Sequence, residues 1–292
     1  GNKFDYMITN PPFGVSWKNE KRFVDDESKD PNGRFSAGTP RTNDGCLLFL
    51  QHLIHKMNPE GSRIGIVLSG SPLFTGDAGS GESEIRKWII ENDWLECIVQ
   101  LPDRMFFNTA ITTYIWIVTN KKSNNRKGKI QLIEGSSFFS PMKKNLGDKG
   151  KYINSKNIKE LFEIYKNNSE NQFCKIFTNN FFGYTKVIIE QPLIENNQIQ
   201  KDRRGNIKPD TSKRDYESIP LSENIEEYFK KEVQPNLLDA WMERSKDKVG
   251  YEINFRKYFY EFKSLRSLED ISEDIKFLDK EIKRLSFEIT NE

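Results

Sequence analysis

The sequence is poor in the residues that build metal sites and disulfides: its 292 residues include three cysteines and two histidines. Cys46, Cys97 and Cys174 are far apart, and no Cys-x-x-Cys or Cys/His spacing is present. We therefore expect reduced thiols and no metal site. His52 and His55 share one amphipathic stretch with apolar residues, a pattern more typical of a helix surface than of a catalytic pair.

Long apolar runs are also missing, since none approaches the roughly 18 residues that indicate a transmembrane helix, and no signal-peptide pattern is present. We expect no contact with a membrane and a soluble, cytoplasmic protein. Neither charge sign dominates, because 45 Lys and Arg face 43 Asp and Glu. That balance neither requires nor excludes nucleic acid, so any such contact must come from local patches. With 36% hydrophobic and 12% aromatic residues, the composition excludes a disordered tail and indicates a sizeable core.

The first 135 residues alternate strand and helix patterns. The spacing of apolar residues predicts helices over 45–57, with Asp44 as the N-cap, and over 82–92. Short apolar runs predict strands over 3–9, 63–68, 95–101, 112–118 and 129–134. This alternation predicts an α/β protein with a mostly parallel sheet and helices on both faces. Because a loop alone joins 95–101 to 112–118, we expect the latter to be an antiparallel edge strand.

Residues from about 140 onward are rich in Lys, Asn and Glu, with one strand pattern over 185–191. A polar, basic stretch over 196–215 suits contact with phosphates, but a solvated loop is the simpler interpretation. The aromatic stretch 251–262 is too apolar to be left in water, so it predicts core or an interface.

The last segment carries a strict 3,4 repeat of apolar residues with charged residues between them. The repeat comprises Leu268, Ile271, Ile275, Leu278, Ile282, Leu285 and Ile289. So narrow a seam favours a helix offered to a helix of a partner. A terminal helix packed on its own domain is the alternative.

A stiff corner follows the first predicted strand, where F-D-Y-M-I-T runs into Asn10, Pro11, Pro12 and Phe13. Each proline fixes its own φ, lacks an N–H and holds the preceding residue extended. The corner therefore presents the Asn10 amide and nearby carbonyls as acceptors, and Phe13 adds a flat face for stacking. These features suit a planar ring with an exocyclic amine, such as adenine. A rigid turn with Phe13 in the core is the alternative interpretation.

The N-P-P-F motif resembles motif IV of the amino-group methyltransferases that use S-adenosylmethionine, specifically the adenine-N6 DNA enzymes. Residues 34–122, 213–242 and 250–262 are similar to the modification subunit of type I restriction-modification systems. The resemblance covers most of the chain and is weakest over about 140–180. It implies the C-terminal half of a Rossmann-like methyltransferase sheet, followed by an irregular extension and a C-terminal heptad helix.

The resemblance implies three parts. Residues 1–140 would be the second half of the catalytic domain, 141–262 an extension of mixed structure, and 263–292 a helical tail for subunit assembly. It also implies S-adenosyl-L-methionine as cofactor and double-stranded DNA as substrate. The implied protein partners are a specificity subunit, a restriction subunit and a second modification subunit.

The resemblance gives the corner a catalytic role. The Asn10 side-chain oxygen and the Pro11 carbonyl would accept hydrogen bonds from the N6 amine of a flipped adenine. Pro12 would fix the corner and Phe13 would stack on the base. Asn10 would also contact the cofactor, whose main glycine-rich motif lies upstream of motif IV in this family. With Gly at position 1, we expect a fragment that lacks this motif and is inactive alone.

A glycine loop at 74–83 lies between a predicted strand and a predicted helix, but its spacing does not match the cofactor fingerprint. Two other functions remain open. A protein glutamine-N5 methyltransferase would use the same corner, although those enzymes usually carry Tyr where this chain has Phe13 and lack the heptad tail. A non-catalytic interaction module would act through the helix over 268–289.

Overall fold

The computed structural model describes residues 2–196, 198–260 and 267–290. Its contacts define one unit over residues 1–258 and a second over 259–292. The boundary predicted between residues 262 and 263 lies outside the described residues, and the division at 140 stays a prediction. In the described ranges, no helix combines the length and the apolar character that crossing a membrane requires.

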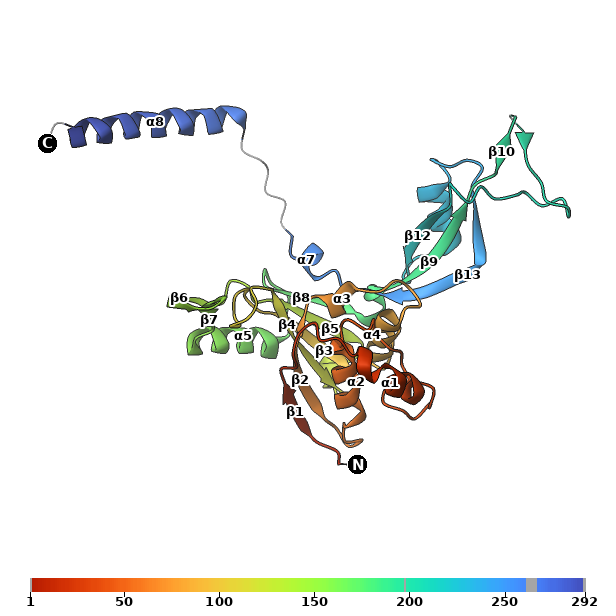
Figure 1. Cartoon of the computed structure of the whole chain (residues 1–292), viewed down its shortest axis with the longest axis horizontal. Helices are drawn as coiled ribbons and strands as arrows, with labels where there is room; N and C mark the ends of the chain where they lie inside the picture. Colours follow the sequence, from red (N-terminus) through yellow and green to blue (C-terminus); the bar gives the residue numbers. More distant parts are fainter. Residues whose placement is uncertain (1, 197, 261–266, 291–292) are drawn as a thin grey trace. The chain divides into compact units, whose positions relative to one another are not determined.

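The larger unit is built on a six-stranded sheet (Figure 1). In spatial order its strands are β1 (Tyr6–Thr9), β2 (Arg63–Ser69), β4 (Thr113–Thr119), β3 (Leu95–Gln100), β5 (Lys129–Glu134) and β8 (Cys174–Thr178). β1 is parallel to β2 and β3 is parallel to β5, whereas β4 and β8 are antiparallel to the strands they pair with. The five predicted strands are present and the α/β class is confirmed, but the sheet is mixed and not mostly parallel, because β4 and β8 run antiparallel to their neighbours.

The position of β4 differs from the prediction. Its antiparallel direction is confirmed, but it lies inside the sheet between β2 and β3, so the expected edge position is wrong. Both of its faces are apolar: Trp116 and Val118 are fully buried on one face, and Ile115 and Ile117 are partly buried on the other. A short loop requires β4 to adjoin β3 but does not fix the side, and burial of both faces favours the interior.

Helices lie on both sides of this sheet, as predicted (Figure 1). They are α2 (Cys46–His55), α4 (Gly81–Glu91) and α5 (Ser155–Asn167). α2 and α4 cover the face on which Ile66 and Trp116 are fully buried. α5 packs Leu161 and Ile164 against the opposite face, over Val99. The sheet is thus sandwiched along β3 and β5, which fixes the strand ends that carry the site.

The start of α2 differs slightly from the prediction, because Gly45 and not Asp44 occupies the N-cap. Asp44 still binds this helix end, since its Oδ1 accepts from the Cys46 N–H at 3.1 Å. Its other oxygen, Oδ2, accepts from the Ser71 hydroxyl at 2.7 Å. Asp44 therefore ties the start of α2 to the loop that follows β2.

Residues after 140 contribute α5 and β8 to the six-stranded sheet and its cover, and the rest of the described stretch before α8 lies outside that sheet. It contains the hairpin β6 (Ser140–Leu146) and β7 (Lys149–Tyr152) and an antiparallel sheet in the order β12 (Asp215–Pro220), β9 (Gly183–Glu190) and β13 (Trp241–Tyr251). β9 confirms the strand predicted over 185–191. The shorter elements are η1 (Lys18–Glu20), α1 (Lys21–Ser28), α3 (Ser71–Phe74), η2 (Asn124–Arg126), η3 (Asn179–Phe182), β10 (Ile194–Glu195), β11 (Gln198–Ile199), α6 (Ile225–Tyr228), the π-helix η4 (Phe229–Val233) and α7 (Phe255–Tyr258).

A buried arginine of α4 holds the end of β13 beside the six-stranded sheet. Arg86 is 1% exposed. Its guanidinium donates to four backbone carbonyls, those of Tyr251 at 2.6 Å, Pro72 at 3.1 Å, Thr75 at 2.7 Å and Gly76 at 3.3 Å. Tyr251, Ile253 and Phe255 are themselves buried, so this part of the aromatic stretch 251–262 is core, as one of the two interpretations predicts, whereas Tyr260 is 74% exposed.

The second unit consists of α8 (Leu268–Thr290), which covers the predicted heptad repeat. Its apolar residues face solvent: Leu268 is 85% exposed, Ile275 60% and Leu278 57%. The side chain of Ile289 lies outside the described residues. An exposed apolar seam of this kind is typical of a helix that packs against another helix. That the other helix belongs to a partner stays a prediction.

Candidate active site

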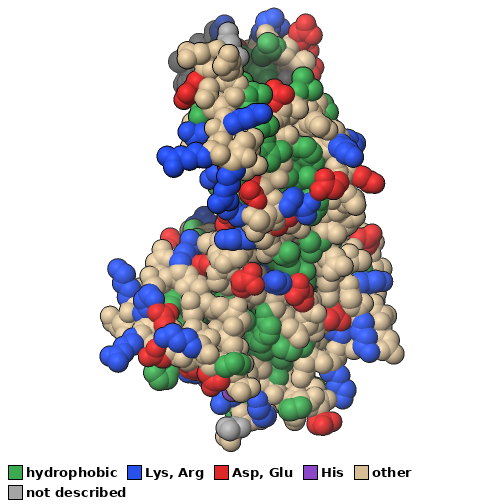
Figure 2. All heavy atoms as spheres, turned by 90° about the vertical axis from the view of Figure 1, so that its right-hand side faces the viewer, with side chains coloured by type: hydrophobic (Ala, Val, Ile, Leu, Met, Phe, Trp, Pro, Cys, Tyr) green, Lys and Arg blue, Asp and Glu red, His purple; other side chains and the backbone are tan. Residues whose placement is uncertain are grey.

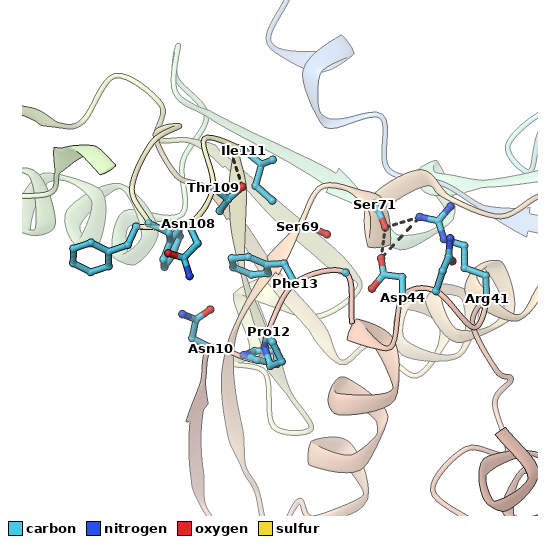
Figure 3. Close-up of a pocket in the computed structure, with 15 residues that line it drawn as sticks. Asn10, Pro12, Phe13, Arg41, Asp44, Ser69, Ser71, Asn108, Thr109 and Ile111 are labelled. Atoms are coloured by element: carbon cyan, nitrogen blue, oxygen red, sulfur yellow. Dashed lines mark hydrogen bonds and ion pairs between the residues drawn. The ribbon is translucent and has the colours of Figure 1, made fainter. Parts of the chain in front are cut away.

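A cavity of about 880 Å³ opens at the carboxyl ends of β1, β2 and β3 (Figure 3), the edge at which open α/β sheets bind ligands. Its volume suits a ligand of nucleotide size. Its walls come from the corner after β1, the loops before α2 and after β2, and the loop between β3 and β4. The lining residues are Asn10, Pro11, Pro12, Phe13, Gly14, Arg41, Asn43, Asp44, Ser69, Ser71, Phe106, Phe107, Asn108, Thr109 and Ile111.

All four residues of the predicted corner line this cavity. Asn10 is exposed, Pro11 is buried and Phe13 is half-buried. The buried Pro11 therefore anchors the corner, and Asn10 and Phe13 on either side of it face the cavity. Gly14 follows with a φ of +62°, in the left-handed region that glycine adopts without strain. The corner thus combines two prolines that fix the backbone with one glycine that reverses it.

The Phe13 ring is held by a second aromatic side chain. It packs edge-on against Phe106, with ring centroids 5.5 Å apart and planes at 78°. In Figure 3 the Asn10 amide, the Phe13 ring and the Asn108 amide border the same space. A flat ligand in that space would meet a ring on one side and two amide groups at its edge.

A polar network forms the opposite wall (Figure 3). The Ser71 hydroxyl donates to Asp44, Arg41 Nη2 donates to Ser71 Oγ at 3.3 Å, and the Arg41 guanidinium lies 3.9 Å from the Asp44 carboxylate. Burial acts to raise the pKa of the Asp44 carboxyl, but hydrogen bonds from Ser71 and Cys46 and the charge of Arg41 outweigh it, so the pKa lies below its ordinary value. Asp44 is therefore a carboxylate at neutral pH, with both oxygens engaged.

Several of these residues were missed by the sequence analysis. The sequence predicts a helix cap at Asp44 and does not mark Arg41, Ser71 or Asn108 as site residues. A signal for Asn108 exists, because the loop over 102–112 follows a strand parallel to β1 and must therefore emerge at the same edge of the sheet. Arg41 and Ser71 offer no comparable signal, since their meeting depends on how two loops fold over α2.

No residue of the glycine loop at 74–83 lines this cavity, although Glu82 of the loop accepts a hydrogen bond from the N–H of Arg41, which does line it. Its glycines permit close packing instead. A Cβ on Gly81 would lie 1.8 Å from the Thr39 carbonyl oxygen, and Gly76 has a φ of +88°. These contacts indicate a packing role for the loop.

Charges of both signs cover the surface drawn in Figure 2, where Lys and Arg alternate with Asp and Glu around hydrophobic patches. No broad field of one sign forms on that face. That face therefore offers no broad cationic surface to a polyanion, whereas the cavity has a cation, Arg41, in its lining.

Comparison with known proteins places the sequence beside one family and several curated relatives. A model of the family described as N-6 DNA Methylase matches residues 1–200. The methylase subunit of the type I restriction enzyme MjaIX from Methanocaldococcus jannaschii is 28% identical over 163 residues, which make up 56% of this chain and 28% of that protein. The methylase subunit of the type I restriction enzyme HindI from Haemophilus influenzae is 35% identical over 133 residues, 45% of this chain and 27% of the relative.

A solved structure shares the fold. The methyltransferase subunit of a type I restriction-modification system from Streptococcus thermophilus superposes with a TM-score of 0.52 at 24% identity, over 61% of this chain and 35% of that chain. The matched residues span less than a third of the length of the curated relatives named above.

Proposed function

The chain belongs to the N-6 DNA methylase family, and on that premise we propose that it is part of the modification subunit of a type I restriction-modification system. The reaction would be methylation of adenine N6 at specific sites in double-stranded DNA. The observation that carries the proposal is the cavity in which the Asn10–Phe13 corner gathers two acceptors and a ring. Glutamine-N5 methylation and a purely structural role, the two alternatives, are not favoured by the family match.

The corner would act on an adenine extruded from the duplex, because its amine is out of reach inside the base stack. The Asn10 side-chain oxygen and the Pro11 carbonyl would each accept one N6 hydrogen, which turns the nitrogen lone pair toward the methyl donor. Pro12 keeps the Pro11 carbonyl free, since it has no N–H. Phe13, braced by Phe106, would stack on the base.

Positioning supplies most of the effect in this scheme. Two fixed acceptors favour the charge that grows on the amine in the transition state more than they favour the neutral ground state. Asp44 supplies a carboxylate to the cavity wall, but its two oxygens already accept hydrogen bonds from Ser71 and Cys46. We assign it a structural role for that reason.

S-adenosyl-L-methionine would supply the methyl group when bound. We assign Asn10 to cofactor binding, because its side-chain amide lies where the adenine N6 amine and the methyl donor must meet. The outer edge of β1 has no neighbouring strand among the described residues, and Tyr6 and Ile8 on it are 79% and 92% exposed. We propose that another segment or chain pairs there and carries the main cofactor loop.

The partners follow from the same assignment. We propose that residues 1–140 act in catalysis, 141–262 extend the catalytic part, and 263–292 assemble the complex. The exposed seam of α8 would dock on helices of a specificity subunit, which reads the sequence, with a restriction subunit and a second modification subunit completing a cytoplasmic assembly.

The test is the Asn10→Ala variant of the complete modification subunit, assembled with its specificity partner and supplied with labelled S-adenosylmethionine. Loss of one oriented acceptor should lower the single-turnover rate of methyl transfer about 10²–10³-fold, with DNA affinity nearly unchanged. Asn125→Ala, at an exposed site on η2, is the matched control. Methylation by Asn10→Ala at the native rate would refute the role.

A further inference from the structure

A second cavity, of about 580 Å³, adjoins the first. Ser71 and Ile111 line both, so the two share a wall at the end of the loop between β3 and β4. Its far side is formed by the stretch 253–257, which includes Arg256 and Lys257. The second cavity has no role in the reaction described above.

The stretch that carries these two cations is firmly held. The Ile253 N–H donates to the Leu73 carbonyl at 2.8 Å, and Phe255 is 3% exposed. The Phe255 ring packs against Tyr114 with centroids 5.3 Å apart. Just upstream, Arg86 grips the Tyr251 carbonyl. A segment from the end of the chain's larger unit is thereby fixed on the strand ends of the catalytic sheet.

The charge balance of this cavity favours an anion. Arg256 and Lys257 are exposed, and neither forms an ion pair with a carboxylate in the part of the chain that the structure describes. Asp103 also lines the cavity, but it is ion-paired with Lys151. The cavity therefore offers two cations, with its carboxylate already neutralised.

We propose that Arg256 and Lys257 bind the DNA backbone phosphates next to the extruded adenine. This inference rests on the proposed function, because the first cavity must hold the base for the second to hold its backbone. A base drawn out of the stack brings its own sugar and flanking phosphates to the cavity mouth, and a guanidinium and an ammonium on a rigid segment suit those oxygens. Such contacts position the nucleotide and carry no sequence information.

The test compares Arg256→Gln/Lys257→Gln with the native protein in the complete enzyme, by titration with a duplex containing the target site at several salt concentrations. Two lost phosphate contacts should reduce the slope of log Kd against log salt by about 1.8. Weakening should be larger for the duplex with the target site than for one without it, because only the former places an extruded base in the first cavity. Lys156→Gln/Lys159→Gln on α5 removes the same charge elsewhere and should leave the slope unchanged. Arg256→Lys with Lys257 intact should restore most of it.

Unfolding midpoints within about 2 °C of each other will show that the variants are folded. A slope equal to that of the α5 control would overturn the proposal, and so would a raised KM for S-adenosylmethionine with an unaltered slope, which would assign the cavity to the cofactor. DNA binding needs no turnover. The binding titration therefore tests the phosphate contacts separately from catalysis. A native enzyme that binds DNA but does not methylate adenine would count against the proposed function instead.

Discussion

Replacement of Arg86 by Met should destabilise the larger unit severely. The side chain is 1% exposed and donates to four backbone carbonyls from two separate segments. A buried carbonyl left without a donor costs about 1–3 kcal/mol, and removal of one partner from a buried charged network costs about 3–5 kcal/mol. Recovery of the desolvation free energy of the guanidinium offsets part of the summed loss, so we expect about 3–5 kcal/mol.

Urea unfolding followed by tryptophan fluorescence would measure this free energy. Arg86→Lys keeps the charge but cannot reach four carbonyls at once, so it should lose roughly half as much. Lys156→Met on α5, where the side chain is 83% exposed, is the control and should change stability by less than about 0.5 kcal/mol. A loss below about 1 kcal/mol for Arg86→Met would show that 251–258 is not held by this residue, and the fixed placement of Arg256 and Lys257 would lose its basis.

Three further predictions concern the site and the tail. Phe13→Ala should weaken binding of the extruded base by about 1–3 kcal/mol, raising the KM for DNA 5–150-fold, while Phe13→Trp keeps a stacking face; equal KM values would contradict stacking. The lowered pKa of Asp44 contributes stability above the ordinary value of 3.8 that is lost as the pH falls through the folded pKa, so the stability difference from Asp44→Asn should be constant from pH 8 to about 5 and shrink below about 4. Leu278→Asp on α8 should abolish co-purification with the specificity subunit, Ser272→Asp should not, and retained assembly in the first variant would refute docking through the seam.

Much of the six-stranded sheet was predictable because its strands are short apolar runs and the helices on it keep helical spacing. The strand over 129–134 matches β5 at both ends. The interior position of β4 was not predictable, since a short loop specifies adjacency and nothing more. α5 was missed although Ile158, Leu161 and Tyr165 keep helical spacing, because lysines and asparagines surround them.

The corner was predictable for a different reason: Asn-Pro-Pro-Phe dictates its own backbone, so four residues of sequence carry most of its geometry. The rest of the cavity depends on tertiary contacts between segments far apart in the chain. Asp44 and Ser71 are 27 residues apart, and Arg86 reaches Tyr251 across 165 residues. No local pattern encodes such pairs, which are decided when the loops close over the sheet.

The central claim is that the corner after β1 holds the extruded base. It is tested most directly by photochemical cross-linking in the complete enzyme, with 5-iodouracil in place of the target adenine and the attached peptide identified by mass spectrometry. Because Phe13 should lie face to face with the base, the account predicts a cross-link on the peptide that contains Phe13, which is lost in Phe13→Ala. A cross-link confined to residues outside the cavity, such as the basic stretch over 196–215, would contradict it.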